Sequence, residues 1–328
     1  MEVKNTNIKN KKIQRKYKKT KSNSKKNKLR LNNIVIKTII IIILLILLYI
    51  LIFYIVKYIK GKRVCLCSVG KKENLYAKEF INHYKKLGYN HIYIYDNNEI
   101  NGERFEDVLQ DEIKSNFVSI INYRGIRNIQ CRAYKDCYEK NNKNYDWLSF
   151  FDFDEFLDIN AKNIQEFLNN KRYEKCQNVK INFLFYSDNE LLYYDKRPLQ
   201  ERFTHALYGH GNNYFIKSTV RGGLKKNYWS VKCCIHTSQM PIYACNSAGQ
   251  KISHGVMGYR PIYKYAKLKH YYTKSTEEYL IKSSRGSASA NVGWNLRRKK
   301  FKFGLYFVYN KKTKEKVELL KKLFNMTL

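Results

Sequence analysis

Two aspartates at the end of a hydrophobic run carry the clearest chemical signal in the chain. In the segment Trp147–Ile159, WLSFFDFDEFLDI, alternate residues of a strand share a face, so the Asp152 and Asp154 carboxylates emerge together where the strand leaves the core. Ligands of doubly wound sheets bind beyond the carboxyl ends of strands, and oxygen ligands suit Mg²⁺ or Mn²⁺. Such an ion can bridge a diphosphate. The alternative is that Asp154 caps a helix and Asp152 faces water.

A second strand end also carries polar side chains. Asp96 and Asn97 follow the apolar run HIYIY directly. An aspartate in this position can hydrogen-bond a base or a ribose, as nucleotide-binding folds require. The alternative is an Asx turn made by Asp96, Asn97 and Asn98.

The elements that position these residues alternate along the first half of the chain. Apolar runs predict strands, and apolar residues spaced three and four apart predict helices. The predicted order is strand 64–69, helix 73–87, strand 91–95, strand 118–121, helix 129–140 and strand 147–151. This alternation predicts an α/β fold with a doubly wound, mostly parallel sheet and flanking helices.

The second half of the chain is less regular. Residues 179–185 predict a strand, and residues 187–223 mix Gly, Asn and Tyr as a loop does. Ser275 followed by Glu278 predicts a capping box that opens a helix to about residue 284, ended by Gly286. Residues 314–324 predict a last amphipathic helix.

The N-terminal region predicts a membrane anchor. The 328 residues include 63 Lys and Arg against 27 Asp and Glu, and 18 of these basic residues but only one acid lie in residues 1–63. Residues 39–56 contain no charge and are long enough to cross a bilayer. A signal peptide, the alternative, has a shorter apolar part followed by a small-residue cleavage site. We therefore expect a basic, disordered cytosolic tail (1–37), a transmembrane helix (38–57), a short stem (58–63) and a catalytic domain (64–328).

The charge imbalance also predicts the orientation of this anchor. More Lys and Arg precede the apolar run than follow it, so the N-terminus is expected in the cytosol. All eight cysteines lie after Arg63, where an oxidising lumen permits disulfides, although the sequence does not choose their pairing. The abundance of aromatic residues, 15% of the chain, excludes disorder for the bulk of it.

Several ordered blocks resemble one enzyme family. They are CSVGKKENLYAKEFINHYKKLGYNHIYIYDNN, IQCRAYKDCYEKN and WLSFFDFDEFLDI, followed by ERF (201–203), FIKSTVRG (215–222), VKCCIHT (231–237) and LKHYYTKSTEEYLIKSSRG (268–286). Over residues 64–286 the chain is similar to the glycosyltransferase family 92 and family 2-like group. The resemblance implies a GT-A fold and a type II membrane enzyme that transfers a sugar, often galactose, from a nucleotide diphosphate to a glycan.

The resemblance also implies roles for individual residues. Asp152 and Asp154 match the Asp-x-Asp ligands of Mn²⁺ or Mg²⁺, with Asp152 also close to the nucleotide sugar, and Asp96 with Asn97 matches a nucleotide contact. His270 is the expected third metal ligand, with His236 and His254 as rivals and a buried, hydrogen-bonded histidine as the alternative. The residues expected to neutralise phosphates, or equally to be surface charges, are Lys217, Arg221, Lys282 and Arg285. The candidate bases are Asp188, Glu190 and Glu201.

The expected reaction is transfer with inversion, in which a carboxylate takes the proton of the acceptor hydroxyl. The expected donor is a UDP-sugar, the acceptor a glycan and the location the Golgi or endoplasmic reticulum, with no nucleic-acid partner. Two other classes remain open: a membrane-tethered polyanion-binding module without catalysis, and a metal-dependent phosphotransferase or nuclease built on the same aspartates. An inactive relative of the transferases is a further possibility. The sequon Asn325–Thr327 decides little.

Overall fold

The computed structural model describes residues 35–54, 62–224, 243–252, 260–285 and 296–324. The chain divides into two compact units, with the division after Gly61. Cys233, Cys234, His236, His254, Gly286 and the sequon at 325–327 lie outside the described residues, as do residues 1–34 of the predicted basic tail. The division into tail, anchor, stem and catalytic domain stays a prediction.

The N-terminal unit contains one described helix, Val35–Tyr54. The helix has 20 residues, an 18-residue stretch of it has a mean hydropathy of 3.2, and its apolar side chains are exposed. At about 1.5 Å per residue it is long enough to cross a membrane. The helix begins three residues before the predicted segment 38–57, whose last three residues are not described.

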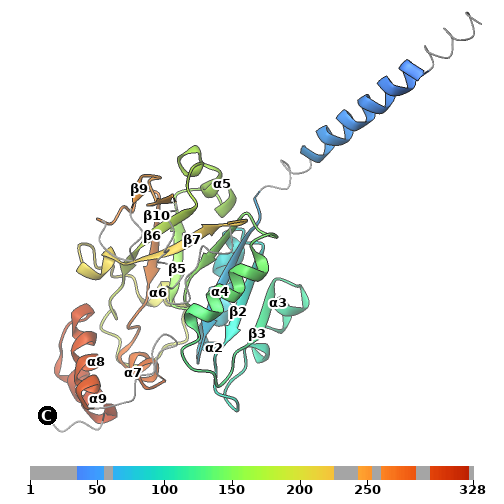
Figure 1. Ribbon diagram of the computed structural model, residues 1–328. Helices are drawn as coiled ribbons and strands as arrows, with labels where there is room; N and C mark the ends of the chain where they lie inside the picture. Colours follow the sequence, from blue (N-terminus) through green and yellow to red (C-terminus); the bar gives the residue numbers. More distant parts are fainter. Residues whose placement is uncertain (1–34, 55–61, 225–242, 253–259, 286–295, 325–328) are drawn as a thin grey trace, which may run out of the picture. The chain divides into compact units, whose positions relative to one another are not determined.

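The second unit is built on one large sheet, whose first half is parallel (Figure 1). The strand order begins β3-β2-β1-β4, and each of these neighbours is paired in parallel. The strands are β1 (Val64–Gly70), β2 (His91–Asp96), β3 (Val118–Asn122) and β4 (Trp147–Phe150). The predicted strands therefore exist, and the expected α/β class with flanking helices is confirmed.

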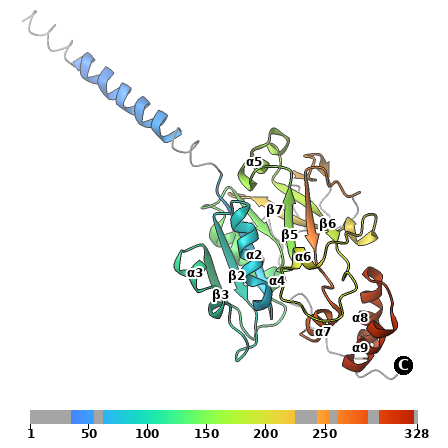
Figure 2. The ribbon, with the colours of Figure 1, turned by 180° about the vertical axis from the view of Figure 1, so that it is seen from behind.

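Helices cover both faces of this parallel half. The helices are α2 (Asn74–Lys86), α3 (Gln110–Lys114) and α4 (Gln130–Asn141), with a 3₁₀ turn, η1, at Phe105–Asp107. Successive residues of β1 point to opposite faces, so Leu66 packs with the buried face of α2 and Cys65 with that of α4. Helix α4 lies in front of the sheet in Figure 1, and α2 lies in front after the half turn in Figure 2.

The second half of the sheet is mixed. It continues as β4-β7-β6-β10-β5, in which only β6 and β10 pair in parallel, and the short β8 and β9 extend from β6. The strands are β5 (Glu155–Ile159), β6 (Asn178–Phe185), β7 (Ile216–Arg221), β8 (Ala244–Cys245), β9 (Lys251–Ile252) and β10 (Ala266–His270). Parallel pairing therefore dominates only the half of the sheet that the alternation of elements predicted.

The prediction of a loop over 187–223 is wrong at β7. This buried strand carries Ser218 and Thr219 in place of an apolar alternation. Their hydroxyls bond side chains of neighbouring strands: Thr219 with Ser149 at 2.9 Å, and Ser218 with Asn178 at 3.3 Å. These bonds satisfy polar groups inside the sheet, which is why apolar periodicity does not reveal the strand.

The remaining helices follow in the second half of the chain. They are α5 (Ile164–Asn169), α6 (Leu199–Arg202), α7 (Thr276–Ser284), α8 (Leu296–Tyr309) and α9 (Lys314–Phe324), with 3₁₀ turns η2 (Lys171–Tyr173) and η3 (Gly211–Tyr214). The predicted capping box is present at α7, with Ser275 and Glu278 each bonding the backbone of the other. Helix α9 has the predicted bounds. Helices α7, α8 and α9 share a small apolar core that includes Tyr279, Tyr306 and Leu320.

Two disulfides link distant parts of the second unit, and their pairing could not be predicted from the sequence. Cys67 of β1 joins Cys137 of α4, and Cys176 joins Cys245 of β8. Each bond closes a long loop, with a sequence separation of 70 or 69 residues. Such links restrict the unfolded chain strongly.

The Cys67–Cys137 bond predicts a large effect on stability. The double substitution Cys67→Ala and Cys137→Ala is expected to lower the free energy of unfolding by about 4 kcal/mol, because it releases a loop of this length in the unfolded chain. Urea unfolding measures the change. Dithiothreitol should destabilise the wild type by a larger amount than the variant, and equal losses in both would contradict the prediction.

His83 of α2 predicts a loss of stability in mild acid. Its Nε2 donates to the Leu157 carbonyl at 2.8 Å, and burial lowers the pKa of its imidazole to about 4. Between pH 6.5 and pH 4 the unfolded state protonates this imidazole, whereas the folded state keeps it neutral. The free energy of unfolding therefore falls as pH decreases through that range, by up to about 3 kcal/mol. His83→Gln keeps a donor for Leu157 and removes the titration. Its unfolding free energy should depend less steeply on pH from 6.5 to 4, and a slope equal to that of the wild type would count against this assignment.

Candidate active site

A cavity of about 280 Å³ lies at the carboxyl ends of β1 and β4. The β1–α2 loop, the start of α4, the residues after β4, the end of β10, and helices α7 and α8 contribute to its lining. Among the predicted site residues, Asp152, Asp154, His270, Lys282 and Arg285 line it. The structure therefore gathers at one place residues that are separated by more than a hundred positions in the chain.

Phenylalanines hold the turn that carries the aspartates. After β4 ends at Phe150, Phe151 and Phe153 are buried in the core while Asp152 and Asp154 line the cavity. Phe153 stacks on Phe80 of α2, with ring centroids 4.6 Å apart. The alternation expected of the strand thus continues past its end, and it turns both carboxylates to the cavity.

Asp152 is held by three donors. Its Oδ2 accepts from Lys217 Nζ at 2.7 Å, and its Oδ1 accepts from Tyr134 Oη at 2.7 Å and from Gln130 Nε2 at 3.2 Å. Burial alone would raise the pKa of Asp152, but the adjacent Lys217 ammonium holds this pKa below its usual value. Asp152 is therefore ionised at neutral pH and fixed in one orientation.

Asp154 faces a lysine and a histidine. Its Oδ2 accepts from Lys282 Nζ and lies 3.6 Å from His270 Nε2. Although burial opposes ionisation, the Lys282 ammonium holds the pKa of Asp154 well below its usual value. A buried carboxylate that stays ionised requires a neighbouring cation.

Glu155 is the member of this group that the sequence did not single out. It is 1% exposed, and its Oε1 lies 3.3 Å from Lys217 Nζ and 3.9 Å from His270 Nε2. Within the described parts of the chain, that oxygen has no hydrogen-bond partner. Burial raises the pKa of Glu155 well above its usual value, despite the nearby Lys217. Burial therefore outweighs the effect of Lys217 and favours the neutral form of this carboxyl group.

His270 reaches the carboxylates through strand pairing. In the antiparallel β5–β10 pair it stands directly opposite Glu155, and in the parallel β6–β10 pair it stands opposite Phe185. The rings of Phe183 and Phe185 lie on it, with centroids 4.5 and 4.6 Å away. Burial lowers the pKa of His270, which leaves the imidazole neutral and able to bind a metal through nitrogen.

Asp154, Glu155 and His270 together fit a divalent cation. One ligand atom from each lies within 4.8 Å of the others. Two carboxyl groups and one neutral imidazole are suitable ligands for Mn²⁺, and Glu155 Oε1, within reach of Lys217 but without a hydrogen-bond partner among the described residues, is available as a ligand atom. The expected ligands were Asp152, Asp154 and His270. In the structure Glu155 completes the compact group, and Asp152 lies beside it with its oxygens already bonded.

The sequence comparison decides the family. The model of glycosyltransferase family 92 matches residues 60–300, about three quarters of the chain. The chain belongs to glycosyltransferase family 92. The expected enzyme class, a glycosyltransferase, is therefore confirmed. No curated protein matches the sequence.

Comparison with solved structures shows a weaker likeness. TarS of S. aureus is 9% identical (TM-score 0.25), with 42% of this chain and 23% of TarS covered. Mannosyltransferase PcManGT from Pyrobaculum calidifontis, in complex with GDP-Man and Mn²⁺, is 10% identical (TM-score 0.28; 47% and 50% covered). TarS 1–349 is 8% identical (TM-score 0.33; 80% and 71% covered). The chain thus spans at most half the length of the first two, and TM-scores this low show no shared site.

Two of the four predicted phosphate-binding residues of the transferase are bonded elsewhere. Arg285 lines the cavity, but its guanidinium donates to the carbonyls of Lys71 and Lys72 and to the Glu73 carboxylate. Arg221 stands opposite Trp147 at the far end of β4, where it bonds backbone carbonyls. The remaining two, Lys217 and Lys282, contact the aspartates.

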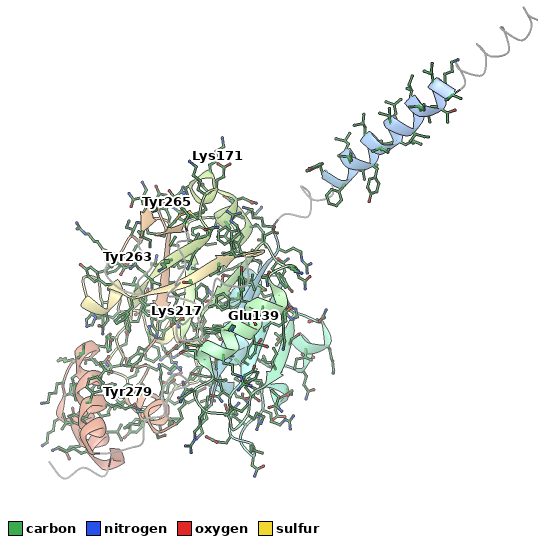
Figure 3. The ribbon with its side chains drawn as sticks, viewed as in Figure 1. Glu139, Lys171, Lys217, Tyr263, Tyr265 and Tyr279 are labelled. Atoms are coloured by element: carbon green, nitrogen blue, oxygen red, sulfur yellow. A yellow bond between two sulfur atoms is a disulfide. The ribbon has the colours of Figure 1, made fainter. Side chains whose placement is uncertain are left out.

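Lys217 and Lys282 reach the aspartates from different parts of the second unit. Lys217 lies near the middle of the second unit, where β7 meets α4, and Tyr279, another cavity residue, lies with the C-terminal helices (Figure 3). Lys217 therefore approaches the carboxylates from the sheet. Lys282, one helical turn beyond Tyr279 on α7, approaches them from the helical side.

The predicted nucleotide contact after β2 lies outside the cavity lining. Asp96 is 1% exposed, forms an ion pair with Arg124 at 2.7 Å, and accepts from the backbone of Asn98. Asn97 donates to the carbonyls of Tyr123 and Ile126. The Asx turn considered from the sequence is thus present, and a nucleotide contact by these residues stays a prediction.

The three candidate bases do not line the cavity either. Asp188 is buried and paired with Lys316 Nζ at 2.6 Å, and it also accepts from Tyr306 Oη. Glu190 is exposed and lies 3.5 Å from Lys311. Glu201 is exposed on α6. Asp188 therefore ties α8 and α9 to the domain, and the identity of the base stays a prediction.

Replacing Glu155 or Asp154 by its amide is expected to change the stability of the protein by different amounts. Glu155→Gln should change the unfolding free energy in EDTA by less than about 1 kcal/mol, because burial raises the pKa of the native carboxyl group and so favours its neutral form. Asp154→Asn should cost about 3 kcal/mol, because it leaves the Lys282 ammonium without its carboxylate. Chemical denaturation in EDTA measures both. The ligand assignment further requires that either substitution reduce the rise in Tm caused by Mn²⁺, and an unchanged rise in both would contradict it.

Proposed function

We propose that this family 92 enzyme transfers a hexose, with galactose favoured, from a UDP-sugar to a glycan acceptor with inversion and with a requirement for Mn²⁺ or Mg²⁺. One observation carries the proposal: Asp154, Glu155 and His270 offer converging ligand atoms, and Asp154 and His270 line a cavity together with Asp152. The cavity lining also contains Lys71, Lys282 and Lys302, whose positive charges suit a diphosphate.

Each residue has a defined task in this proposal. When bound, the divalent cation supplies positive charge for the diphosphate leaving group. Asp154, Glu155 and His270 hold it, and Asp152, fixed by Lys217 and Tyr134, faces the same space. The lysines of the cavity lining add positive charge around the phosphates.

Inversion requires a carboxylate to take the proton of the acceptor hydroxyl while its oxygen attacks the anomeric carbon from the face opposite the leaving group. Glu190 and Glu201 are the proposed bases because both are exposed to solvent, whereas Asp188 is enclosed by Lys316 and Tyr306. Both glutamates lie on the chain between β6 and β7, in the segment expected to face an acceptor.

The proposed location is the lumen of the Golgi or endoplasmic reticulum, in type II orientation. The helix Val35–Tyr54 is apolar enough to anchor the chain, and basic residues are concentrated before it. Two disulfides in the second unit favour an oxidising compartment. Membership of a glycosyltransferase family favours transfer over the polyanion-binding, phosphotransferase and nuclease alternatives.

The metal requirement predicts that Asp154→Ala reduces transfer about 100-fold or more, because a ligand of the cation that stabilises the leaving group is lost; Asp152→Ala should reduce transfer similarly, because a carboxylate that faces the same space is lost. The assay is release of UDP and formation of glycoside by the full-length enzyme with Mn²⁺ and a panel of UDP-sugars. Asp158→Ala is the control, since Asp158 is paired with Lys267 and Lys269 outside the cavity lining. Undiminished transfer by both cavity variants, with the control also active, would reject the metal assignment.

A further inference from the structure

The oxygen of Asp154 that faces the proposed metal site is already used by an ammonium group. Lys282 Nζ donates to Asp154 Oδ2 and to the Tyr272 carbonyl at 2.9 Å, and it lies 4.2 Å from the centre of the Tyr272 ring. The same Oδ2 is the atom that lies 3.6 Å from His270 Nε2. A cation held by Asp154 and His270 therefore meets the Lys282 ammonium at a shared oxygen.

The two lysines of the site differ in their freedom to move. Lys217 is a strand residue whose side chain is 9% exposed and bridges Asp152 and Glu155. Lys282 lies in the last turn of α7, lines the cavity and has a side chain that is 20% exposed. Lys282 is thus the ammonium that can leave its carboxylate by turning into the cavity.

The Lys282 ammonium and a divalent cation repel each other when both bind the same oxygen of Asp154. A metal ion binds a carboxylate oxygen at about 2.1 Å, so an ammonium hydrogen-bonded to the same oxygen stays within a few ångströms of it. In a buried site this repulsion is only weakly screened. Binding of the cation therefore favours departure of Lys282.

The other carboxylates of the described cavity lining already have cations. Asp152 is paired with Lys217, and Glu73 is paired with Arg285 and, at 3.3 Å, with Lys274. A displaced Lys282 consequently finds no unpaired carboxylate within the part of the lining that the structure describes. A phosphate group entering the same cavity supplies the missing negative charge.

We propose that Lys282 is an exchangeable counter-ion: it neutralises Asp154 before the divalent cation binds, and it turns to the diphosphate of the donor when the cation takes Asp154. This inference rests on the proposed function. It makes binding of the cation and of the diphosphate mutually favourable, because the diphosphate draws away the ammonium that competes with the cation. Lys282 is therefore a positioning residue for the donor and a competitor for the metal.

The test measures binding without catalysis. Full-length wild type and Lys282→Gln are titrated with Mn²⁺ alone, with Mn²⁺ counted by electron paramagnetic resonance, and then with Mn²⁺ in the presence of UDP. Lys282→Gln should bind Mn²⁺ alone about tenfold more tightly, since its competitor is gone, and UDP should improve its Mn²⁺ affinity about tenfold less than in the wild type. Lys282→Arg keeps the positive charge and should retain most of the coupling.

The control is Lys267→Gln, which removes the same charge from an ion pair with Asp158 outside the cavity lining and should bind Mn²⁺ as the wild type does. Thermal unfolding in EDTA verifies that each variant is folded. If Lys282→Gln binds Mn²⁺ no more tightly than the wild type, or UDP still helps it equally, the counter-ion exchange is wrong. If the wild type and Asp154→Asn bind Mn²⁺ equally, or neither binds it with UDP present, the proposed metal site itself is wrong.

Discussion

The site depends on the concentration of three carboxylates at the point where β4 ends and β5 begins. Asp152, Asp154 and Glu155 lie within four residues and share two lysines and a neutral imidazole. Buried carboxylates are costly unless each has a cation or a proton. Asp152 and Asp154 are each paired with a lysine, whereas burial raises the pKa of the third, Glu155, and favours its neutral form. A divalent cation would add positive charge beside this third carboxyl group and favour its ionised form.

The mixed sheet is what brings the partners of these carboxylates to them. Lys217 comes from β7, which runs antiparallel beside β4, and His270 comes from β10, which lies between β6 and β5. Helix α7 adds Lys282 from the other side of the cavity. A purely parallel continuation of the first four strands would not place a residue of β10 opposite Glu155. The irregular half of the chain therefore positions the site, and the regular half supplies the strand end on which it is built.

The regular half could be predicted from the sequence, because apolar periodicity marks strands and helices whose faces are apolar. The run before Asp152, the helix 73–87 and the strand before Asp96 all fall close to their predicted bounds. The capping box at α7 was visible because its two side chains bond each other locally. Strands β5, β7 and β10 were missed, since their identity depends on pairing with distant strands. The polar contacts of Ser218 and Thr219 inside the sheet show why periodicity fails there.

The same distinction between local and distant partners explains which of the predicted site residues line the cavity and which do not. Sequence patterns pointed to Asp152 and Asp154 because two acids directly after an apolar strand are unusual, and the adjacent Glu155 belonged to the same signal. Residue type alone could not separate Lys282, which faces the cavity, from Arg221, which bonds carbonyls at the other end of β4. The function of a charged residue in so basic a chain is decided by which carboxylate lies within reach. At Asp154 that partner is Lys282, and the proposed divalent cation would compete with it for the same oxygen.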